Sequence, residues 1–310
     1  MLTTYPRAES SAPGIAPVWL DLLDPSDDER RQAAALLGCE LPTRKQVASI
    51  ALSTRVRASD EQLRINIPGF VREDGGQGAL TPLGVLLTPR LLVTLRYAPS
   101  VAFDRMTGDV ARHNAPASSI EAFVALFESV AATAADRMES LSGELSQLSR
   151  EVFSDSDSHG SMLRGVLFKI GRIQRQMTQI RAATLGVQRG LSHLCEGAPK
   201  WLGQAPVARL QVVLSDLHAF GEFDQQMDDK VQFLLDATLG FINNNQNDLI
   251  RFLTIASVVT IPPMILAGIW GMNYKSIPEY DWPHGYLFAW TMIILSMAVP
   301  LAWFKWKKWF

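Results

Sequence analysis

The pattern of apolar and polar positions divides the chain into three stretches of different character. In roughly the first hundred residues, short runs alternate apolar and polar side chains, as at Leu63, Ile65 and Ile67, which is typical of strands with one buried face. From residue 118 onward the apolar positions recur with a helical period. At the C-terminal end, two apolar segments without a charged residue follow each other, at 252–270 and 286–304.

The first stretch predicts a small α/β domain. A short strand is expected at 19–22, followed by a helix that Asp24 caps and that ends near Gly38. Two further strands are expected within 53–71, and a hairpin is expected at 85–97.

The second stretch predicts three long helices. Ser118 and Glu121 have the spacing of a capping box, and the helical pattern that follows runs to about 153. A second helix is expected at 162–195, so these two form an antiparallel hairpin. A third is expected from 207, and if it continues into the first apolar segment it covers about 64 residues, or roughly 95 Å. Such a helix cannot bury itself against one small domain, which favours a bundle of identical stalks and therefore a homo-oligomer.

The predicted fold class is α+β, with an N-terminal cytosolic α/β domain, a long helical hairpin, and a very long stalk helix that continues into a two-helix transmembrane hairpin. The expected boundaries are 1–116 for the α/β domain, 117–206 for the helical hairpin, 207–248 for the stalk helix and 249–310 for the membrane hairpin.

Each apolar segment has 19 residues, which is long enough to cross a bilayer core as a helix. Lys305, Lys307 and Lys308 follow the second segment and Arg251 precedes the first, so both termini are expected in the cytosol and the loop 271–285 outside. The N-terminus has no export signal, which agrees with a cytosolic domain. The expected location is the cell membrane, with two passes.

Charge and motifs exclude several function classes. The net charge is −2, but residues 251–310 carry five bases against two acids, whereas the rest carries 24 bases against 29 acids. A nucleic-acid partner would require a basic patch, which is not evident. There is no Gly-x-x-x-x-Gly-Lys-Ser/Thr phosphate loop and no evident Ser/His/Asp set, so neither an ATP-driven pump nor an enzyme is expected. Cys39 and Cys195 are expected to be buried thiols rather than a disulfide.

The loop between the two apolar segments opens with Gly271-Met272-Asn273. By position alone, this tripeptide suits the end of a helix as well as an ion-selective loop. Together with two spans, Pro278-Glu279 and a basic-aromatic tail, the layout resembles the CorA family of divalent-cation channels, whose mark is Gly-Met-Asn at the end of the first of two spans. The resemblance covers nearly the whole chain, is most specific over 231–310, and is closest to the magnesium/cobalt branch.

The resemblance implies a passive homo-oligomeric channel, a pentamer, for the uptake of hydrated Mg²⁺ and also Co²⁺. It implies no cofactor beyond transported and regulatory Mg²⁺, and membrane lipids and divalent cations as partners. It also implies closure by intracellular Mg²⁺ that carboxylates bind between subunits, for which Asp216 is a possible ligand. Taken one at a time, however, acids on this helix are expected to lie on a solvated face.

Physical chemistry supports a role for the loop. Mg²⁺ gives up its waters reluctantly, so a selective loop should hold the hydrated ion with neutral oxygens such as the Asn273 amide and the carbonyls near Gly271. A ring of Glu279 carboxylates would raise the local cation concentration at the mouth, whereas Asp281 is expected to be solvated.

One face of the first span is expected to line the pore. Its positions recur every three or four residues, which is equally typical of helix packing in a bundle, and the resemblance assigns them to the pore. They are Asn247, Ile250, Leu253 (or Thr254), Ser257, Ile261, Met264 and Gly268. Apolar rings there could close the pore by dewetting. Pro262 and Pro263 leave two carbonyls unbonded, which a pore can satisfy.

Two alternatives remain at this point. The first is a zinc transporter of the related ZntB branch, against which the Pro278-Glu279 pair is thin evidence. The second is a membrane-anchored sensor or scaffold that transports nothing. Asp155, Asp157 and His159 have a ligand-like spacing but are expected to be solvated turn residues.

Overall fold

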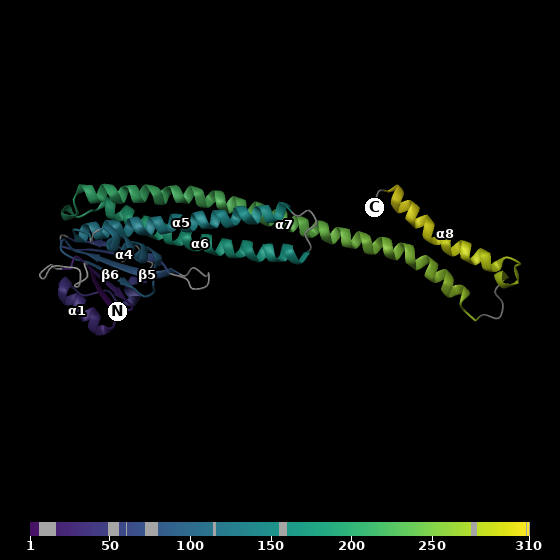
Figure 1. Ribbon diagram of the computed structural model, residues 1–310, viewed down its shortest axis with the longest axis horizontal. Coiled ribbons are helices and arrows are strands. Elements are labelled where there is room, and N and C mark those ends of the chain that lie inside the picture. The colour runs from purple at the N-terminus through teal and green to yellow at the C-terminus, as the bar shows by residue number, and fades with distance from the viewer. Residues whose placement is uncertain are drawn as a thin grey trace. The chain divides into compact units, whose positions relative to one another are not determined.

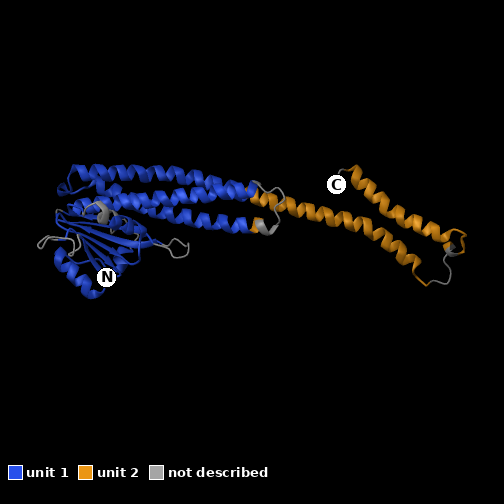
Figure 2. Ribbon diagram, in the orientation of Figure 1, with its two compact units in different colours: residues 1–156, 165–235 blue, residues 157–164, 236–310 orange. Residues whose placement is uncertain are grey.

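The computed structural model describes residues 1–5, 17–48, 56–59, 61–71, 80–113, 116–154, 160–273, 278–307 and 309. They form two compact units (Figure 2). Unit 1 comprises 1–156 and 165–235, and unit 2 comprises 157–164 and 236–310. The expectation of solvated residues at Asp155, Asp157 and His159 falls outside the described residues.

Unit 1 contains a six-stranded sheet in the order β1-β2-β6-β5-β4-β3 (Figure 1). Its strands are β1 (Leu2–Tyr5), β2 (Trp19–Leu23), β3 (Val56–Ala58), β4 (Leu63–Phe70), β5 (Leu80–Leu87) and β6 (Leu92–Arg96). All neighbours pair antiparallel except β2 and β6, which are parallel. The predicted strands at 19–22 and within 53–71 and the predicted hairpin at 85–97 are confirmed, and β1 is an addition.

A buried ion pair joins the two parallel strands. Arg96 Nε and Nη2 bind the Asp21 carboxylate, with Nη2 2.6 Å from Oδ2, and the Arg96 guanidinium lies 4.7 Å above the Phe103 ring. Thr94 donates its hydroxyl to Asp21 and accepts a bond from the Trp19 indole. None of the buried side-chain atoms of these residues lacks a hydrogen-bond partner, which is the condition under which buried charges are tolerated.

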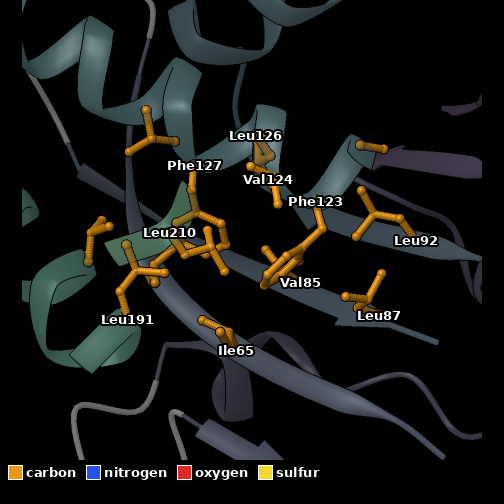
Figure 3. Packing of buried hydrophobic residues seen from close by; sticks show 14 of the residues in the cluster. Ile65, Val85, Leu87, Leu92, Phe123, Val124, Leu126, Phe127, Leu191 and Leu210 are labelled. Atoms are coloured by element: carbon orange, nitrogen blue, oxygen red, sulfur yellow. The ribbon is translucent and has the colours of Figure 1, made fainter. Parts of the chain in front are cut away.

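Helices cover both faces of the sheet. On one face, helix α1 (Asp27–Leu37) packs on Leu20, Leu22 and Val93. On the other, Ile65, Val85 and further strand residues contact the long helices through Phe123, Phe127, Leu191 and Leu210 (Figure 3). The alternation of inward residues along each strand produces these two separate cores.

Helix α1 begins two residues later than predicted. Ser26, not Asp24, is the N-cap, and it forms a reciprocal capping box with Glu29. Asp24 instead has a φ of 44° and donates its backbone N–H to the Arg96 carbonyl, so it ends β2 in a tight bend. Gly38 terminates the helix at a φ of 77°, as expected, and Thr43 caps the short helix α2 (Arg44–Val47).

Four long helices follow the sheet. They are α4 (Val101–His113), α5 (Ser119–Ser154), α6 (Gly160–Glu196) and α7 (Gln204–Trp270). Helix α4 was not predicted; it buries Ala102, Phe103 and Met106 under the sheet. Helices α5 and α6 confirm the predicted hairpin. Helix α7 starts three residues before the predicted position, because Pro206 is tolerated in its first turn.

The α5 N-terminus shows a variant of the predicted capping box. Ser118 Oγ accepts the Glu121 N–H at 3.2 Å, as expected. The Glu121 carboxylate, however, accepts the N–H of Ala117 rather than that of Ser118. The reciprocal bond is therefore displaced by one residue while the helix still begins at its predicted place.

Helices α5, α6 and the first part of α7 run side by side (Figure 1) and share an apolar core. We call this core the three-helix seam. It includes Met138, Leu141, Leu145 and Leu148 of α5, Ile173, Met177 and Ile180 of α6, and Met227, Val231 and Leu234 of α7. The spacing alternates between three and four residues, which is the pattern of helices that pack along their length.

Unit 2 contains the rest of α7, a short 3₁₀ turn η3 (Pro278–Asp281) and helix α8 (Gly285–Trp306). Both predicted spans are helical, and both are apolar and long enough to cross a membrane. None of the most apolar window of α7 is buried within the chain, and 6% of that of α8 is. Within a single chain, the spans therefore have very few buried residues.

The two cysteines, Cys39 and Cys195, are free and half-buried, which confirms that they form no disulfide with each other. Burial raises the pKa of both thiols. Because the thiolate is the reactive form, neither is poised for chemistry at neutral pH.

Candidate functional site

Helix α7 ends at Trp270, so the Gly-Met-Asn tripeptide follows its last turn directly. The Gly271 N–H still donates to the Ala267 carbonyl at 2.9 Å, and the Met272 N–H donates to Ile269 at 3.2 Å. Among the described glycines, only Gly38 and Gly203 have a positive φ, so Gly271 is no left-handed cap. A Cβ at Gly271 would lie 3.1 Å from the Ala267 oxygen, so close backbone approach is what favours glycine here.

Asn273 and Met272 are exposed in the single chain, as a residue that meets an ion or another subunit must be. Glu279 lies in η3 and is half-buried, while Asp281 is exposed, as expected. The structure thus places the Asn273 amide and the Glu279 carboxylate on the same short loop. Their assignment to ion selection stays a prediction.

Sequence reasoning missed Gly285, the first residue of α8. An ideal Cβ there would lie 2.1 Å from the Glu279 carbonyl oxygen, which is closer than real atoms approach. The Gly285 N–H also donates to the Trp282 carbonyl at 3.0 Å. A glycine between a polar loop and an apolar span was the available signal. Gly285 lets the turn that carries Glu279 close against the start of α8.

The predicted pore-lining positions all lie on α7. At about 100° per residue they fall within about a third of the helix circumference. In the single chain Ser257 is half-buried and the other six are exposed. A stripe that stays exposed in one chain can line a pore only when other copies surround the same axis, so its pore role also stays a prediction.

The hydroxyl groups of this segment are bonded within the helix. Thr254 donates to the Ile250 carbonyl at 2.7 Å, Ser257 to Leu253 at 2.8 Å, and Thr260 to Ala256 at 2.7 Å. Helix α7 continues through Pro262 and Pro263 without ending. Each proline lacks an N–H, so the carbonyl four residues earlier loses its helical donor, as expected.

Asp216 is an exposed residue of α7 in unit 1. It lines a groove of about 370 Å³ between α5 and α7 beside Glu128 and Arg209, which pair at 2.8 Å. Among the residues that the structure describes, no three His, Cys, Asp or Glu side chains gather as metal ligands. In the part of the chain that the structure describes, Asp216 therefore belongs to no group of three or more such side chains.

The expectation that each acid of this helix is solvated is wrong for Asp224. Its exposure is only 6%, and it binds the Arg181 guanidinium of α6. Arg181 also lies 3.5 Å from Asp228, and the bond with Asp224 raises the pKa of Arg181. Helical period alone could not show this, because Asp224 faces a cavity beside the three-helix seam rather than water.

At the end of α8, aromatic rings gather around Phe304, which is buried. The rings of Trp303 and Trp309 lie 5.2 and 5.3 Å from that of Phe304, and Lys307 Nζ lies 5.0 Å above the Trp303 ring. Trp306 is 79% exposed. The basic-aromatic tail is thus a small aromatic cluster with a base beside it, a composition that suits the headgroup region of a membrane.

Comparison with known proteins gives consistent results. A family model described as CorA-like Mg²⁺ transporter protein matches residues 16–308. The magnesium transport protein CorA of Escherichia coli is 31% identical over 305 residues, which is 98% of this chain and 95% of that protein.

Two solved structures show the same fold at low identity. The CorA magnesium transporter from Methanocaldococcus jannaschii matches with a TM-score of 0.75 at 17% identity, over 94% of this chain and 91% of that one. The ZntB cytoplasmic domain from Vibrio parahaemolyticus matches with a TM-score of 0.51 at 14% identity, over 74% and 87%. At such identities the likeness concerns the fold alone.

Proposed function

Because this chain belongs to the CorA-like Mg²⁺ transporter family, we propose that it is a passive homo-oligomeric channel, a pentamer, for the uptake of hydrated Mg²⁺. Co²⁺ is proposed as a second transported ion. Members of this family are transporters rather than enzymes, and the proposed channel uses no cofactor.

One observation carries the proposal: within a single chain, no residue of the most apolar window of α7 is buried, and only 6% of that of α8 is. Apolar surface of this extent is stable only where lipid or other protein covers it. Lipid would cover the outward faces, and copies of the same chain would cover the rest. In that arrangement the stripe from Asn247 to Gly268 faces the central axis. In this assembly, several copies together would form a pore that a single chain could not form.

The outer entrance is assigned to Gly271, Met272 and Asn273. The Asn273 amide oxygen and nearby carbonyls would accept hydrogen bonds from the water around Mg²⁺, so the ion need not lose its shell. Glu279, on the same loop, would attract cations to the mouth without binding them tightly.

Deeper in the pore, Ile250, Leu253, Ile261 and Met264 would form apolar rings that stop conduction by dewetting. Asn247 would form a polar ring at the cytosolic end, and Ser257 and Gly268 would leave wider sections between the rings. Closure would follow a rise in intracellular Mg²⁺, with Asp216 as a ligand shared between subunits.

The proposed topology places both termini in the cytosol. The basic residues Lys305 and Lys307 after the second span, and Arg251 before the first, favour this orientation. Residues 1–116, 117–206 and 207–248 would then form the cytosolic domain, hairpin and stalk, and residues 249–310 the membrane part. Nucleic acid is not a proposed partner.

The alternatives are less well supported. The zinc-carrier alternative rests on a likeness to a ZntB cytoplasmic domain at 14% identity, which carries no information about the pore. The scaffold alternative disagrees with the family match, because that family is described as a transporter family.

Flux through the purified protein tests the proposal. The full chain would be reconstituted into vesicles, and entry of Mg²⁺, Co²⁺ and Zn²⁺ measured with and without a pH gradient. We expect Mg²⁺ and Co²⁺ to enter without a gradient and the Asn273→Ala protein to be inactive. Zn²⁺ entry that requires a proton gradient would instead establish the carrier alternative. The mass of the detergent-solubilised particle tests the assembly, and a monomer would contradict it.

A further inference from the structure

Three aromatic rings meet within unit 2, where α7 ends and α8 begins. The central ring belongs to Phe288, in the first turn of α8. Its centroid lies 5.4 Å from that of Trp282 and 6.4 Å from that of Trp270, with interplanar angles of 63° and 68°. Both contacts are edge-to-face, which is a favoured geometry of aromatic pairs. We call these three residues the aromatic bridge.

The aromatic bridge connects the two ends of the loop that carries the proposed selectivity residues. Trp270 is the last residue of α7 and directly precedes Gly271. Trp282 directly follows the η3 turn, and its N–H donates to the Glu279 carbonyl at 3.4 Å. Phe288 therefore contacts one residue next to the Gly-Met-Asn tripeptide and one residue that is bonded to the turn of Glu279.

The backbone around Trp282 is closely held. The Gly285 N–H donates to the Trp282 carbonyl at 3.0 Å, and an ideal Cβ at Gly285 would lie 3.7 Å from the Trp282 Cβ. The same Cβ would overlap the Glu279 carbonyl oxygen. Because these groups are packed against one another, a shift of the Trp282 ring also displaces the turn that carries Glu279.

A tryptophan near the end of a membrane span also has an ordinary role among lipid headgroups. Trp282 is 52% exposed and Trp290, further along α8, is 51% exposed, so exposure alone does not separate the two residues. Their contacts do. Trp282 shares the Phe288 ring with Trp270, whereas no ring contact of Trp290 occurs among the described residues. The aromatic bridge thus has a specific partner at each end, which a headgroup anchor does not need.

We propose that Phe288 is a positioning residue, which holds the turn of Glu279 at a fixed place relative to Asn273 through the two indoles. This inference rests on the proposed channel function, in which Glu279 attracts cations to the mouth and Asn273 accepts them. An edge-to-face contact shifts a local equilibrium by about two- to tenfold, so two such contacts strongly favour one position of the turn. The attraction of a cation by Glu279 falls with distance, so it weakens when the turn moves away.

The test measures initial Mg²⁺ entry into vesicles that contain the full chain, over a range of external Mg²⁺ concentrations. Phe288→Leu keeps an apolar side chain but removes the ring. We expect it to raise the half-saturating concentration by about two- to tenfold while the maximal rate stays close to that of the wild type. Phe288→Tyr keeps the ring and should keep the wild-type concentration. Trp290→Leu removes a similarly exposed ring from α8 and, as the control, should leave that concentration unchanged.

A second background separates positioning from a general structural effect. In Glu279→Gln, adding Phe288→Leu should not raise the half-saturating concentration further, because the carboxylate through which Phe288 acts is absent. An increase of equal size in both backgrounds would overturn the proposal. So would a lower maximal rate at an unchanged half-saturating concentration, because Phe288 would then serve folding or assembly alone.

The ring contacts can be measured without transport. In protein labelled with fluorotryptophan, the fluorine NMR signals of Trp270 and Trp282 should both shift on Phe288→Leu, while those of the other tryptophans stay in place. Unmoved signals would contradict the aromatic bridge itself. A wild-type chain that carries no Mg²⁺ would refute the channel function. Normal wild-type entry with an unaltered Phe288→Leu variant would instead refute the positioning role alone.

Discussion

The three-helix seam of unit 1 and the two spans of unit 2 have apolar residues at the same helical spacings, but only the seam buries them within the chain. Leu234 in the seam is fully buried, whereas Leu253 in the first span is 62% exposed. Both lie on the single helix α7. The comparison teaches that an apolar stripe shows that a helix face must be buried, but not what buries it. In the seam α5 and α6 bury it, and in the spans lipid and other copies are proposed to do so.

The largest expected effect tests the outer loop of the membrane unit. Asn273→Ala should reduce Mg²⁺ entry into vesicles to the level of empty vesicles, because the amide oxygen that accepts the hydrated ion is lost. The particle mass should not change, since the apolar spans that are proposed to hold the copies together keep their sequence. Wild-type entry rates in this variant would remove Asn273 from the selectivity role.

The next prediction compares the same substitution in both regions. Leu234→Ala should destabilise unit 1 by about 2–5 kcal/mol, because it leaves a cavity in the seam. Leu253→Ala removes a side chain that is 62% exposed in its own chain. It should leave the free energy of unfolding of unit 1, measured in urea, unchanged within about 0.5 kcal/mol. Equal destabilisation by both would show that the two apolar stripes have the same kind of cover.

Glycines sharpen the contrast further. Gly285→Ala should slow Mg²⁺ entry several-fold, because its Cβ would overlap the Glu279 carbonyl and displace the turn that holds Glu279. Gly171→Ala, on an open surface of α6, should instead leave entry unchanged and stabilise unit 1 by up to about 1 kcal/mol. If the Gly285→Ala protein conducts normally, the close approach of Gly285 to the Glu279 carbonyl is not needed for transport.

The apolar rings give a smaller effect. Ile250→Ser should make the closed channel leakier, since a polar ring is harder to dewet. The measurement is residual Mg²⁺ entry at high internal Mg²⁺, with Ile294→Ser on α8 as a control outside the proposed stripe. A leak that does not rise at Ile250, or that rises equally at Ile294, contradicts a gate at this position.

The smallest effect concerns the surface of unit 1. Glu128→Gln breaks an ion pair with Arg209 whose side chains are 41% and 52% exposed. Exposed pairs contribute about 0–1 kcal/mol, so the urea midpoint should hardly move and should become insensitive to salt. A loss as large as that of Leu234→Ala would mean that the pair has a role beyond the single chain.

Most of the fold could be predicted because its signals are local. Gly38 and Ser118 mark helix ends by chemistry that acts over three or four residues, and the two spans are evident from their length and lack of charge. The prediction of Asp24 as the N-cap was wrong. Aspartate is a common N-cap residue, but here the bend after β2 holds Asp24 at a positive φ. Helix α4 escaped because its stability comes from a sheet that forms elsewhere in the sequence.

The site was less predictable for the same reason. The Gly-Met-Asn motif could be found in the sequence, but the contact between Gly285 and Glu279 depends on how the chain turns. The burial of Asp224 depends on Arg181, which lies 43 residues away in the sequence. Neither feature has a periodic signature, so only the folded chain shows them.

The hydroxyl groups of the first span have a consequence for biogenesis. The hydroxyl groups of Thr254, Ser257 and Thr260 each donate a hydrogen bond to a carbonyl of the preceding turn. None of them therefore presents a free donor to hydrocarbon. A segment leaving the ribosome with these bonds already formed can partition sideways into a bilayer almost as if those residues were alanines. The oxygen lone pairs remain, so after assembly the same residues can still face water.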